Sequence, residues 1–312
     1  MKNRHLSLFL LASLIVSGCL SAPSASNSEP ASDEQPSAYS TDFETDPFEA
    51  GWYWDKPAWA KKAGKPGTAA WRERAEPAGG KCLEVSDGMW RSPKIEVEPL
   101  TLAAVRIESQ ADSSGYWGLL SYDADGEEIP ASPYSRIPGS KTWTWNESAV
   151  LIPQDAVYSR VLLWPRDSPI RADNISVTPV SRSQALAIAD RTYSEVPPVE
   201  PDYSGSTRTG IEHTLKTLGE GGEVRILMLG DSVSNDLANA NFHLFLERRF
   251  DGARVTLLNK VGSGAGASNF LENDRIGKMI ETHNPDLVMF GGISNTAKDI
   301  PAIRRLAERV PC

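Results

Sequence analysis

A Gly-Asp-Ser triplet at residues 230–232 is the stretch of this sequence whose residue types could do chemistry. It directly follows an apolar run at 223–229, which has the composition of a buried strand. A serine between a strand and a helix lies near the helix N-terminus, where backbone N–H groups point outward and can stabilise a developing oxyanion. Ser232 is a weak nucleophile until a base removes its proton, so the sequence must also supply a base.

Two further apolar runs end in residues of a similar kind. Residues 253–259 lead into Lys-Val-Gly-Ser-Gly-Ala-Gly, and residues 285–291 lead into Gly-Ile-Ser-Asn. Helix-like segments at 240–250 and 270–283 separate the three runs. This alternation predicts a βαβαβ unit with a parallel sheet, and the carboxyl ends of its strands are where ligands bind.

Taken together, the three strand ends resemble those of the SGNH (GDSL) hydrolase family. The resemblance implies a flavodoxin-like sheet with Ser232 as the nucleophile. It also implies an oxyanion hole made by the N–H of Ser232, the N–H of Gly264 and the side-chain amide of Asn295. Gly264 is preferred over Gly262 and Gly266 because the segment Asn-Lys-Val-Gly-Ser-Gly fits the family's Asn-x-x-x-x-Gly spacing.

The third strand end departs from the family's Gly-x-Asn-Asp pattern. The chain has Gly-Ile-Ser-Asn, which leaves Ser294 as an alternative donor to Asn295. Residues 262–267 also fit the glycine pattern of a dinucleotide-binding turn. That reading is rejected because the next strand ends in Phe-Gly-Gly at 290–292, without the acidic residue that would bind a ribose.

The base of the SGNH family is a histidine in an Asp-x-x-His motif, which the aspartate orients. None of the four histidines, His5, His213, His243 and His283, has an aspartate three residues before it. The segment 223–312 also has only three of the about five strands of a flavodoxin-like sheet. We therefore expect an incomplete hydrolase domain, in a chain that is either a fragment of a longer protein or frameshifted, and that is itself inactive.

Residues 41–181 have the pattern of an all-β domain. Short strand-like runs are separated by Gly- and Pro-containing turns, and they lie at 81–85, 94–98, 103–109, 116–123, 148–153, 159–165 and 173–180. Many short strands of this kind predict a sandwich. Three segments resemble a carbohydrate-binding-module jelly roll of the galactose-binding-like type, namely 42–52, 140–164 and 171–180. The resemblance implies carbohydrate as the partner.

All nine tryptophans lie between residues 52 and 164. We expect Trp145, Trp164 and most of the others in the core, and the loop-like segment 51–59 as the best candidate for partly exposed rings that could stack on sugars. By the same resemblance, Glu44 and Asp173 match positions that often hold a structural calcium ion, with two ordinary exposed carboxylates as the alternative. No other cofactor is expected.

The first 18 residues are predicted to be a lipoprotein signal peptide. A basic start precedes an apolar run that is too short to span a membrane, and Val-Ser-Gly-Cys then resembles a bacterial lipobox. This resemblance implies cleavage before Cys19 and lipid on that residue. Residues 19–40 are rich in Ser, Ala and Pro, which is typical of a disordered tether. The protein would then be extracytoplasmic and anchored by lipid to the bacterial outer membrane or cell surface.

The fold class follows as two domains. An all-β jelly-roll sandwich at 41–181 is joined by a connector at 182–222 to the first half of an α/β flavodoxin-like (SGNH hydrolase) parallel sheet at 223–312. The net charge of −9, from 32 basic and 41 acidic residues, argues against a nucleic-acid partner. We expect an extracytoplasmic serine esterase acting on acyl or acetyl esters of a polysaccharide. The alternative is a surface glycan-binding lipoprotein with a vestigial, inactive hydrolase domain.

Overall fold

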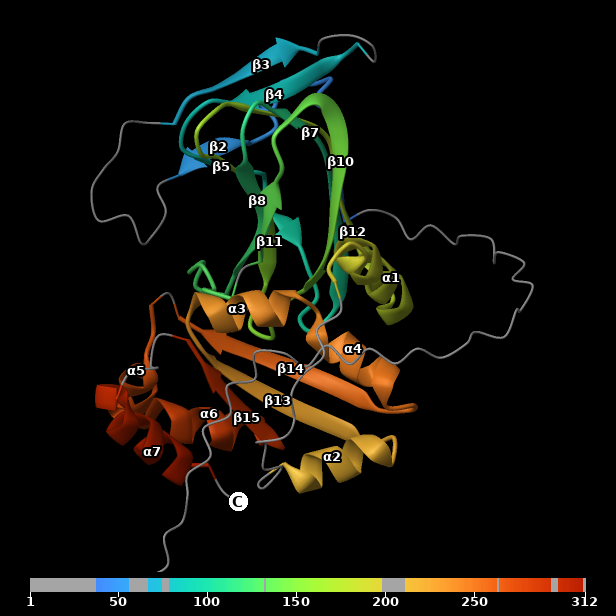
Figure 1. Ribbon diagram of the computed structural model, residues 1–312. Helices are drawn as coiled ribbons and strands as arrows, with labels where there is room; N and C mark the ends of the chain where they lie inside the picture. The colour runs from blue at the N-terminus through green and yellow to red at the C-terminus, as the bar shows by residue number, and fades with distance from the viewer. Residues whose placement is uncertain are drawn as a thin grey trace, which may run out of the picture.

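The protein consists of a β-sandwich followed by a smaller α/β unit (Figure 1). The computed structural model describes residues 38–55, 67–74, 79–131, 133–197, 211–262, 264–292 and 297–310. Within these residues, two antiparallel sheets of six strands form the sandwich, and a separate parallel sheet has three strands. Figure 1 shows the sandwich standing above the parallel sheet, with helices between them.

The two sheets of the sandwich are called sheet A and sheet B. Sheet A contains β1 (Tyr39–Thr41), β3 (Ala69–Glu73), β4 (Lys81–Val85), β7 (Leu102–Ala111), β10 (Ser140–Leu151) and β12 (Ile170–Val180). Its order is β10-β7-β12-β4-β3, with β1 on β12. Sheet B contains β2 (Tyr53–Asp55), β5 (Met89–Arg91), β6 (Ile95–Glu96), β8 (Gly115–Tyr122), β9 (Tyr134–Ile137) and β11 (Tyr158–Pro165). Its order is β2-β5-β11-β8-β9, with β6 on β11.

Strand β7 shows how the sequence builds the sandwich. Val105 and Ile107 are buried in the core between the sheets, whereas Arg106 is exposed on the other face. This is the alternation of a half-buried strand, as predicted. Trp117 and Phe43 lie in the same core at 2% and 0% exposure. The predicted sandwich is confirmed, and its mainly antiparallel sheets are consistent with a jelly roll.

The α/β unit has the predicted βαβαβ order. Its parallel strands are β13 (Glu223–Gly230), β14 (Arg254–Val261) and β15 (Leu287–Gly291), in the spatial order β14-β13-β15. On the central strand, Ile226 and Met228 point into one apolar cluster, and Leu227 and Leu229 point into another. Both faces of the sheet are therefore covered, which is why the strand is a continuous apolar run.

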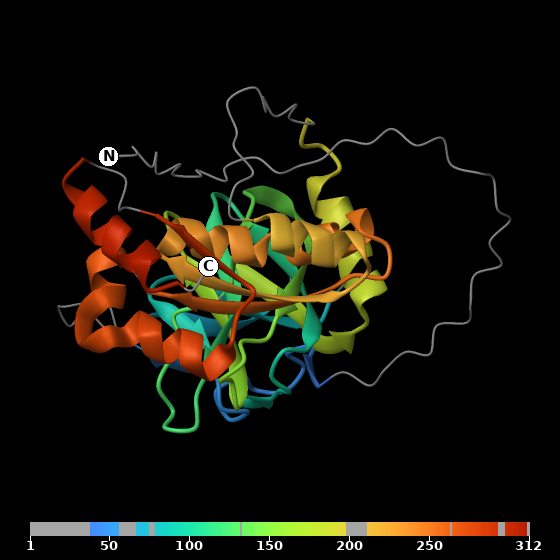
Figure 2. The same ribbon diagram turned by 90° about the horizontal axis from the view of Figure 1, so that it is seen from below.

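The described residues form seven helices, and all but the first, which packs on sheet A, cover these faces. They are α1 (Arg182–Tyr193), α2 (Glu212–Gly219), α3 (Ser232–Asn239), α4 (Phe242–Arg249), α5 (Ala267–Leu271), α6 (Arg275–His283) and α7 (Ile300–Glu308), with short 3₁₀ turns at Glu272–Asp274 and Ala297–Asp299. Helices α5, α6 and α7 group on one side of the sheet (Figure 2). No helix in the described ranges is long and apolar enough to cross a membrane.

One predicted helix is wrong in its extent. The segment 270–283 was expected to be a single helix, but Asn273 and Asp274 have φ angles of 51° and 53°. These left-handed conformations break the helical path, so that α5 and α6 are separate elements. The short strands β1, β2, β3, β5 and β9 were also missed, since runs of three to five residues show little periodicity.

The sandwich and the α/β unit share a packed interface. Apolar residues of sheet A, α1 and α4 form one cluster there, which consists of Leu102, Ala104, Ala149, Ala185, Ile188 and Leu244. The side chain of Asn241 donates a hydrogen bond across the interface to the carbonyl of Ala149, at 3.0 Å. An ion pair of 2.5 Å joins Arg182 on α1 to Glu247 on α4. Helix α1, in the predicted connector, thus packs against both halves.

Candidate functional site

Ser232 is the first residue of α3 and is exposed to solvent. The preceding Asp231 caps the helix, because its carboxylate accepts a hydrogen bond of 2.9 Å from the backbone N–H of Val233. The carbonyl of Asp231 also accepts the first helical bond, from Asn235, at 3.0 Å. The structure therefore places the Ser232 hydroxyl at a helix N-terminus beyond the end of β13, as the triplet predicted.

Glycines allow the strand ends to come together beside Ser232. Gly230 has a φ of +144°, and a Cβ atom there would lie 2.1 Å from the carbonyl oxygen of Gly291. Gly292 has a φ of +113°, and its Cβ would lie 2.3 Å from the Asp231 carboxylate. No other residue type fits these two positions without movement of the backbone. The ends of β13 and β15 consequently meet at the capping carboxylate.

The loop after β14 reaches the same place. The N–H of Gly262 donates to the carbonyl of Gly230 at 2.9 Å, which ties this loop to the residues just before Ser232. Gly264 follows two residues later, is exposed, and has a left-handed φ of +67°. Ser294 and Asn295 lie outside the described residues, and the predicted oxyanion hole as a whole stays a prediction.

The described histidines do not supply a base for Ser232. His243 is 1% exposed, and burial, aided by the nearby charge of Arg182, lowers its pKa to about 3. His243 lies beside residues 255–257 of β14. Ser232 lies near the other end of this strand, because it follows Gly230, and Gly230 pairs with Val261. Four to six strand residues separate these levels, a distance of about 13–20 Å.

The other two described histidines lie on the helices that precede β13 and β15. His213 is an exposed residue of α2, and His283 is the last residue of α6. Burial, and then the charge of Lys260, lowers the pKa of His283. None of the hydrogen bonds of the described residues joins Ser232 to a histidine.

The predicted calcium residues are engaged by other groups. Asp173 is buried and paired with Arg74 at 2.5 Å, and the same guanidinium binds Glu108 at 2.6 Å. Burial raises the pKa of Asp173, although its contacts with Arg74 act in the opposite direction. The Glu44 carboxylate accepts a hydrogen bond of 2.9 Å from the N–H of Lys81. Within the described ranges, no three His, Cys, Asp or Glu side chains gather as a metal site would require.

The tryptophan predictions were partly wrong. Trp52, expected in an exposed loop, is 3% exposed in the core, and Trp54 packs against that core. Trp145, expected to be buried, is 53% exposed on the outer face of sheet A, with the guanidinium of Arg106 at 4.7 Å from its ring. Trp59 lies outside the described residues.

The outer face of sheet B gathers aromatic rings, of which the sequence singled out only Trp164. That residue was expected in the core but is half-buried on this outer face. The register of the strands places six rings on this face: Tyr53, Tyr116, Tyr122, Tyr134, Tyr158 and Trp164. The rings of Tyr122 and Tyr158 are stacked, with their centroids 4.8 Å apart. Tyr134 is 39% exposed, and burial of its hydroxyl raises its pKa to about 12. The face therefore offers both packed and accessible rings.

Arg91 stands at the centre of this face, which we call the sheet B face. Its guanidinium is 4% exposed and lies 3.1 Å from the Asp55 carboxylate and 3.0 Å from that of Glu128. It also donates a hydrogen bond to the Tyr122 hydroxyl. Burial raises the pKa of Glu128 despite the charge of Arg91 beside it. The contacts hold a charged, hydrogen-bonding centre among the aromatic rings.

Sequence reasoning missed the sheet B face for a clear reason. Its residues come from β2, β5, β8, β9 and β11, which span residues 53–165, and three of these strands are five residues or shorter. The one available signal was the spacing in Tyr-Trp-Gly-Leu-Leu-Ser-Tyr (116–122), which puts Tyr116 and Tyr122 on one side of a strand.

The chain was compared with known proteins. No protein-family model matches it, and no curated protein matches it. A solved structure of the CBM22-1 xylan-binding domain from Paenibacillus barcinonensis Xyn10C is 12% identical over 48% of this chain and 99% of that chain, with a TM-score of 0.33. The Family 16 Carbohydrate Binding Module-2 is 15% identical over 39% of this chain and 89% of that chain, with a TM-score of 0.29.

Another similar structure is the enzymatically active domain of bacteriophage CBA120 tailspike protein 4. It is 12% identical over 36% of this chain, with a TM-score of 0.33, and the match spans only 18% of that chain. At these TM-scores the likenesses carry no argument about function, so the proposals below depend on this chain's own geometry.

Proposed function

We propose that the sandwich binds carbohydrate on the sheet B face. The observation that carries the proposal is the gathering of six aromatic rings on the same surface as the guanidinium of Arg91. Aromatic rings provide flat apolar area for the C–H faces of sugars, and the accessible ring of Tyr134 is the best placed of them for stacking. Binding sites for small polar ligands commonly combine such rings with a few fixed polar groups.

The sheet B face carries charged groups of both signs. Asp55 and Glu128 lie beside Arg91, and the guanidinium of Arg160 lies 4.9 Å from the ring of Tyr53. Further basic side chains border the other rings, namely Lys94, Arg136 and Arg166. Guanidinium groups donate hydrogen bonds and carboxylates accept them, so together these side chains match sugar hydroxyls, which do both. The Asp55 side chain is 42% exposed and so is accessible to such a ligand.

Affinity electrophoresis against a panel of neutral and acidic soluble polysaccharides tests this proposal. Tyr134→Ala is expected to weaken binding to the polysaccharide that retains the protein most strongly by about tenfold, which corresponds to about 1.4 kcal/mol. Trp145→Ala is the matched control, because it removes an exposed ring from sheet A instead. Loss of binding with Trp145→Ala alone would move the site to the other sheet, and no retention by any polysaccharide would refute glycan binding.

A second proposal concerns the α/β unit. We propose that Ser232 is the nucleophile of a serine esterase acting on acyl or acetyl esters of a polysaccharide, within a flavodoxin-like SGNH hydrolase domain. Two observations favour it: the exposed serine at the start of α3, and the order β14-β13-β15, which agrees with the first three strands of such a sheet. The N–H groups of Ser232 and Gly264, with Asn295, would form the oxyanion hole.

This esterase proposal requires a general base from outside the described residues. The test therefore uses the protein as its source cell produces it, treated with a fluorophosphonate probe that labels activated serines. We expect labelling and hydrolysis of p-nitrophenyl acetate, both abolished by Ser232→Ala and unaffected by Ser183→Ala, a change to an exposed serine on α1. Labelling that survives Ser232→Ala, or no labelling at all, would reject the esterase.

A lipid anchor at Cys19 completes the proposal for where the protein works. The lipobox-like segment before this residue supports it. Growth of an expressing bacterium with an alkyne-labelled palmitate should label the protein and place it in the outer membrane or at the cell surface. Cys19→Ser should abolish the label, and an unlabelled Cys19 protein would contradict the anchor.

A further inference from the structure

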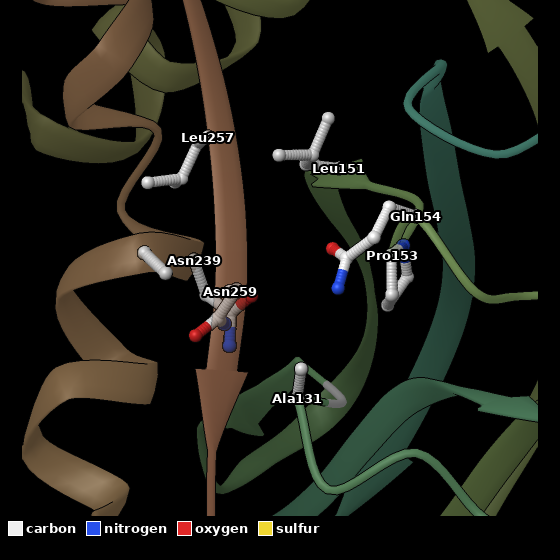
Figure 3. Close-up of a pocket in the computed structure, with 8 residues that line it drawn as sticks. Ala131, Leu151, Pro153, Gln154, Asn239, Leu257 and Asn259 are labelled. Atoms are coloured by element: carbon white, nitrogen blue, oxygen red, sulfur yellow. The ribbon is translucent and has the colours of Figure 1, made fainter. Parts of the chain in front are cut away.

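A small cavity lies between the sandwich and the α/β unit, near the C-terminal end of α3. Its volume is about 10 Å³, and its lining comes from both halves of the protein. Figure 3 shows Pro153 and Gln154 of the sandwich on one side and Asn259 of β14 on the other. Asn239, the last residue of α3, completes the polar part of the lining.

Three buried amide atoms in this lining have no hydrogen-bond partner among the described residues. They are Oε1 of Gln154, Nδ2 of Asn239 and Oδ1 of Asn259. The Asn259 residue is only 7% exposed. Buried polar atoms in folded proteins almost always have a partner, so three of them around one cavity indicate a bound molecule.

Neighbouring contacts determine which way two of the amides point. The Nδ2 of Asn259 donates to Oδ1 of Asn235 at 3.2 Å, and the Nε2 of Gln154 donates to Asp155 at 3.4 Å. Each amide nitrogen is thus used elsewhere, which leaves the oxygen for the cavity. With Nδ2 of Asn239, the cavity presents two acceptors and one donor.

We infer that this cavity binds a single water molecule that bridges the two halves of the protein. The water would donate hydrogen bonds to Gln154 and Asn259 and accept one from Asn239. A metal ion or ammonium could not accept from Asn239, and an anion could not donate to the two oxygens. A cavity needs roughly 10–15 Å³ to hold one water, which typically makes about three hydrogen bonds, so both the size and the number of partners fit.

The bridge has a structural consequence for α3. This helix begins at Ser232 and ends at Asn239, so the water connects its far end to the loop of the sandwich that carries Gln154. An ion pair between Lys260 and Asp155 lies next to it and joins the same two halves. The water is therefore a positioning element for α3, whatever the activity of Ser232.

A crystal structure of the full chain at better than about 2 Å resolution tests the inference directly. We expect one density peak within about 3.2 Å of all three amide atoms, refined as water. A peak that refines as an ion, or amide atoms that face the cavity with no peak, would overturn the inference.

A double-mutant cycle tests it independently. Gln154→Met and Asn239→Leu change residues between which no direct hydrogen bond is found, and each should lower the Tm by about 2–4 °C. The double variant should lower the Tm by clearly less than the sum of the two single shifts, since either change alone releases the shared water. The control is Gln110→Met, which changes a residue of β7 away from the cavity. Its shift in Tm should add to that of either cavity variant. Strictly additive shifts for the cavity pair would contradict a shared molecule.

Discussion

Replacing His243 with leucine should remove a major part of the acid sensitivity of this protein. His243 lies on α4 at the interface of the two halves, and neither of its ring nitrogens has a hydrogen-bond partner among the described residues. It borders a cavity of about 20 Å³ that Arg182 also lines. Burial keeps the ring neutral in the folded protein and lowers its pKa to about 3.

The size of the effect follows from proton binding. In the unfolded chain the pKa of a histidine is about 6.5, so between pH 6.5 and 3 the unfolded state binds a proton that the folded state does not. The free energy of unfolding therefore falls as the pH drops through this window. The stability that the neutral His243 ring contributes is fully present only above pH 6.5. Between pH 7.5 and pH 5 the loss is about 2 kcal/mol, from about 1.36 kcal/mol per pH unit.

Urea unfolding of the wild-type protein and of His243→Leu at pH 7.5 and pH 5 measures this difference. Tryptophan fluorescence reports on the sandwich, which contains all nine tryptophans, and circular dichroism at 222 nm reports on the helices, which follow it. The variant should match or exceed the wild type at pH 7.5, because a buried polar group without partners is removed. At pH 5 the free energy of unfolding of the variant should exceed that of the wild type by about 2 kcal/mol more than it does at pH 7.5.

Carboxylates also contribute to acid sensitivity, and the difference between the two proteins cancels their effect. The control is His213→Leu, which changes an exposed histidine and should keep the wild-type pH dependence. Equal losses of stability for the wild type and His243→Leu would show that the buried ring is protonated normally, and would refute the reasoning.

Three further predictions use the same unfolding assay. Gly292→Ala should destabilise the protein by about 1–3 kcal/mol, because the residue has a φ of +113° and its Cβ would lie 2.3 Å from the Asp231 carboxylate. The control Gly219→Ala, at a position with open space around it, should leave the stability unchanged. Equal effects of the two substitutions would contradict this reasoning. Arg91→Leu should cost about 1.5–3 kcal/mol, because the half-buried Glu128 carboxylate loses its hydrogen-bonded guanidinium partner. The control is Arg72→Leu, which changes a side chain that is 58% exposed and should cost about 1 kcal/mol or less. A larger loss of stability for Arg72→Leu than for Arg91→Leu would contradict this prediction. Asn241→Ala should cost about 1–3 kcal/mol through the lost bond to Ala149 and the φ of +59°, and Asn241→Gly, which tolerates that φ, should cost less.

The sequence predicted elements whose residues are close together in the chain. The alternation around Val105 and Ile107 is a local property of one strand, and β7 lies where it predicted. The run before Gly230 is continuous because both faces of β13 are buried. The glycines at the strand ends were visible in the sequence, whereas their φ angles and close approaches are known only from the structure.

Only the tertiary structure decided what each side chain faces. Local sequence predicted the wrong surroundings for Trp52 and Trp145: Trp52 is in the core and Trp145 is exposed, because strand register and neighbouring elements determine the face. The sheet B face brings Asp55, Arg91 and Glu128 together from positions far apart in the chain. The alternation of apolar and polar residues along a strand predicts that its two faces have different environments. The pairing of distant strands determines which face is covered and which remains available to a ligand.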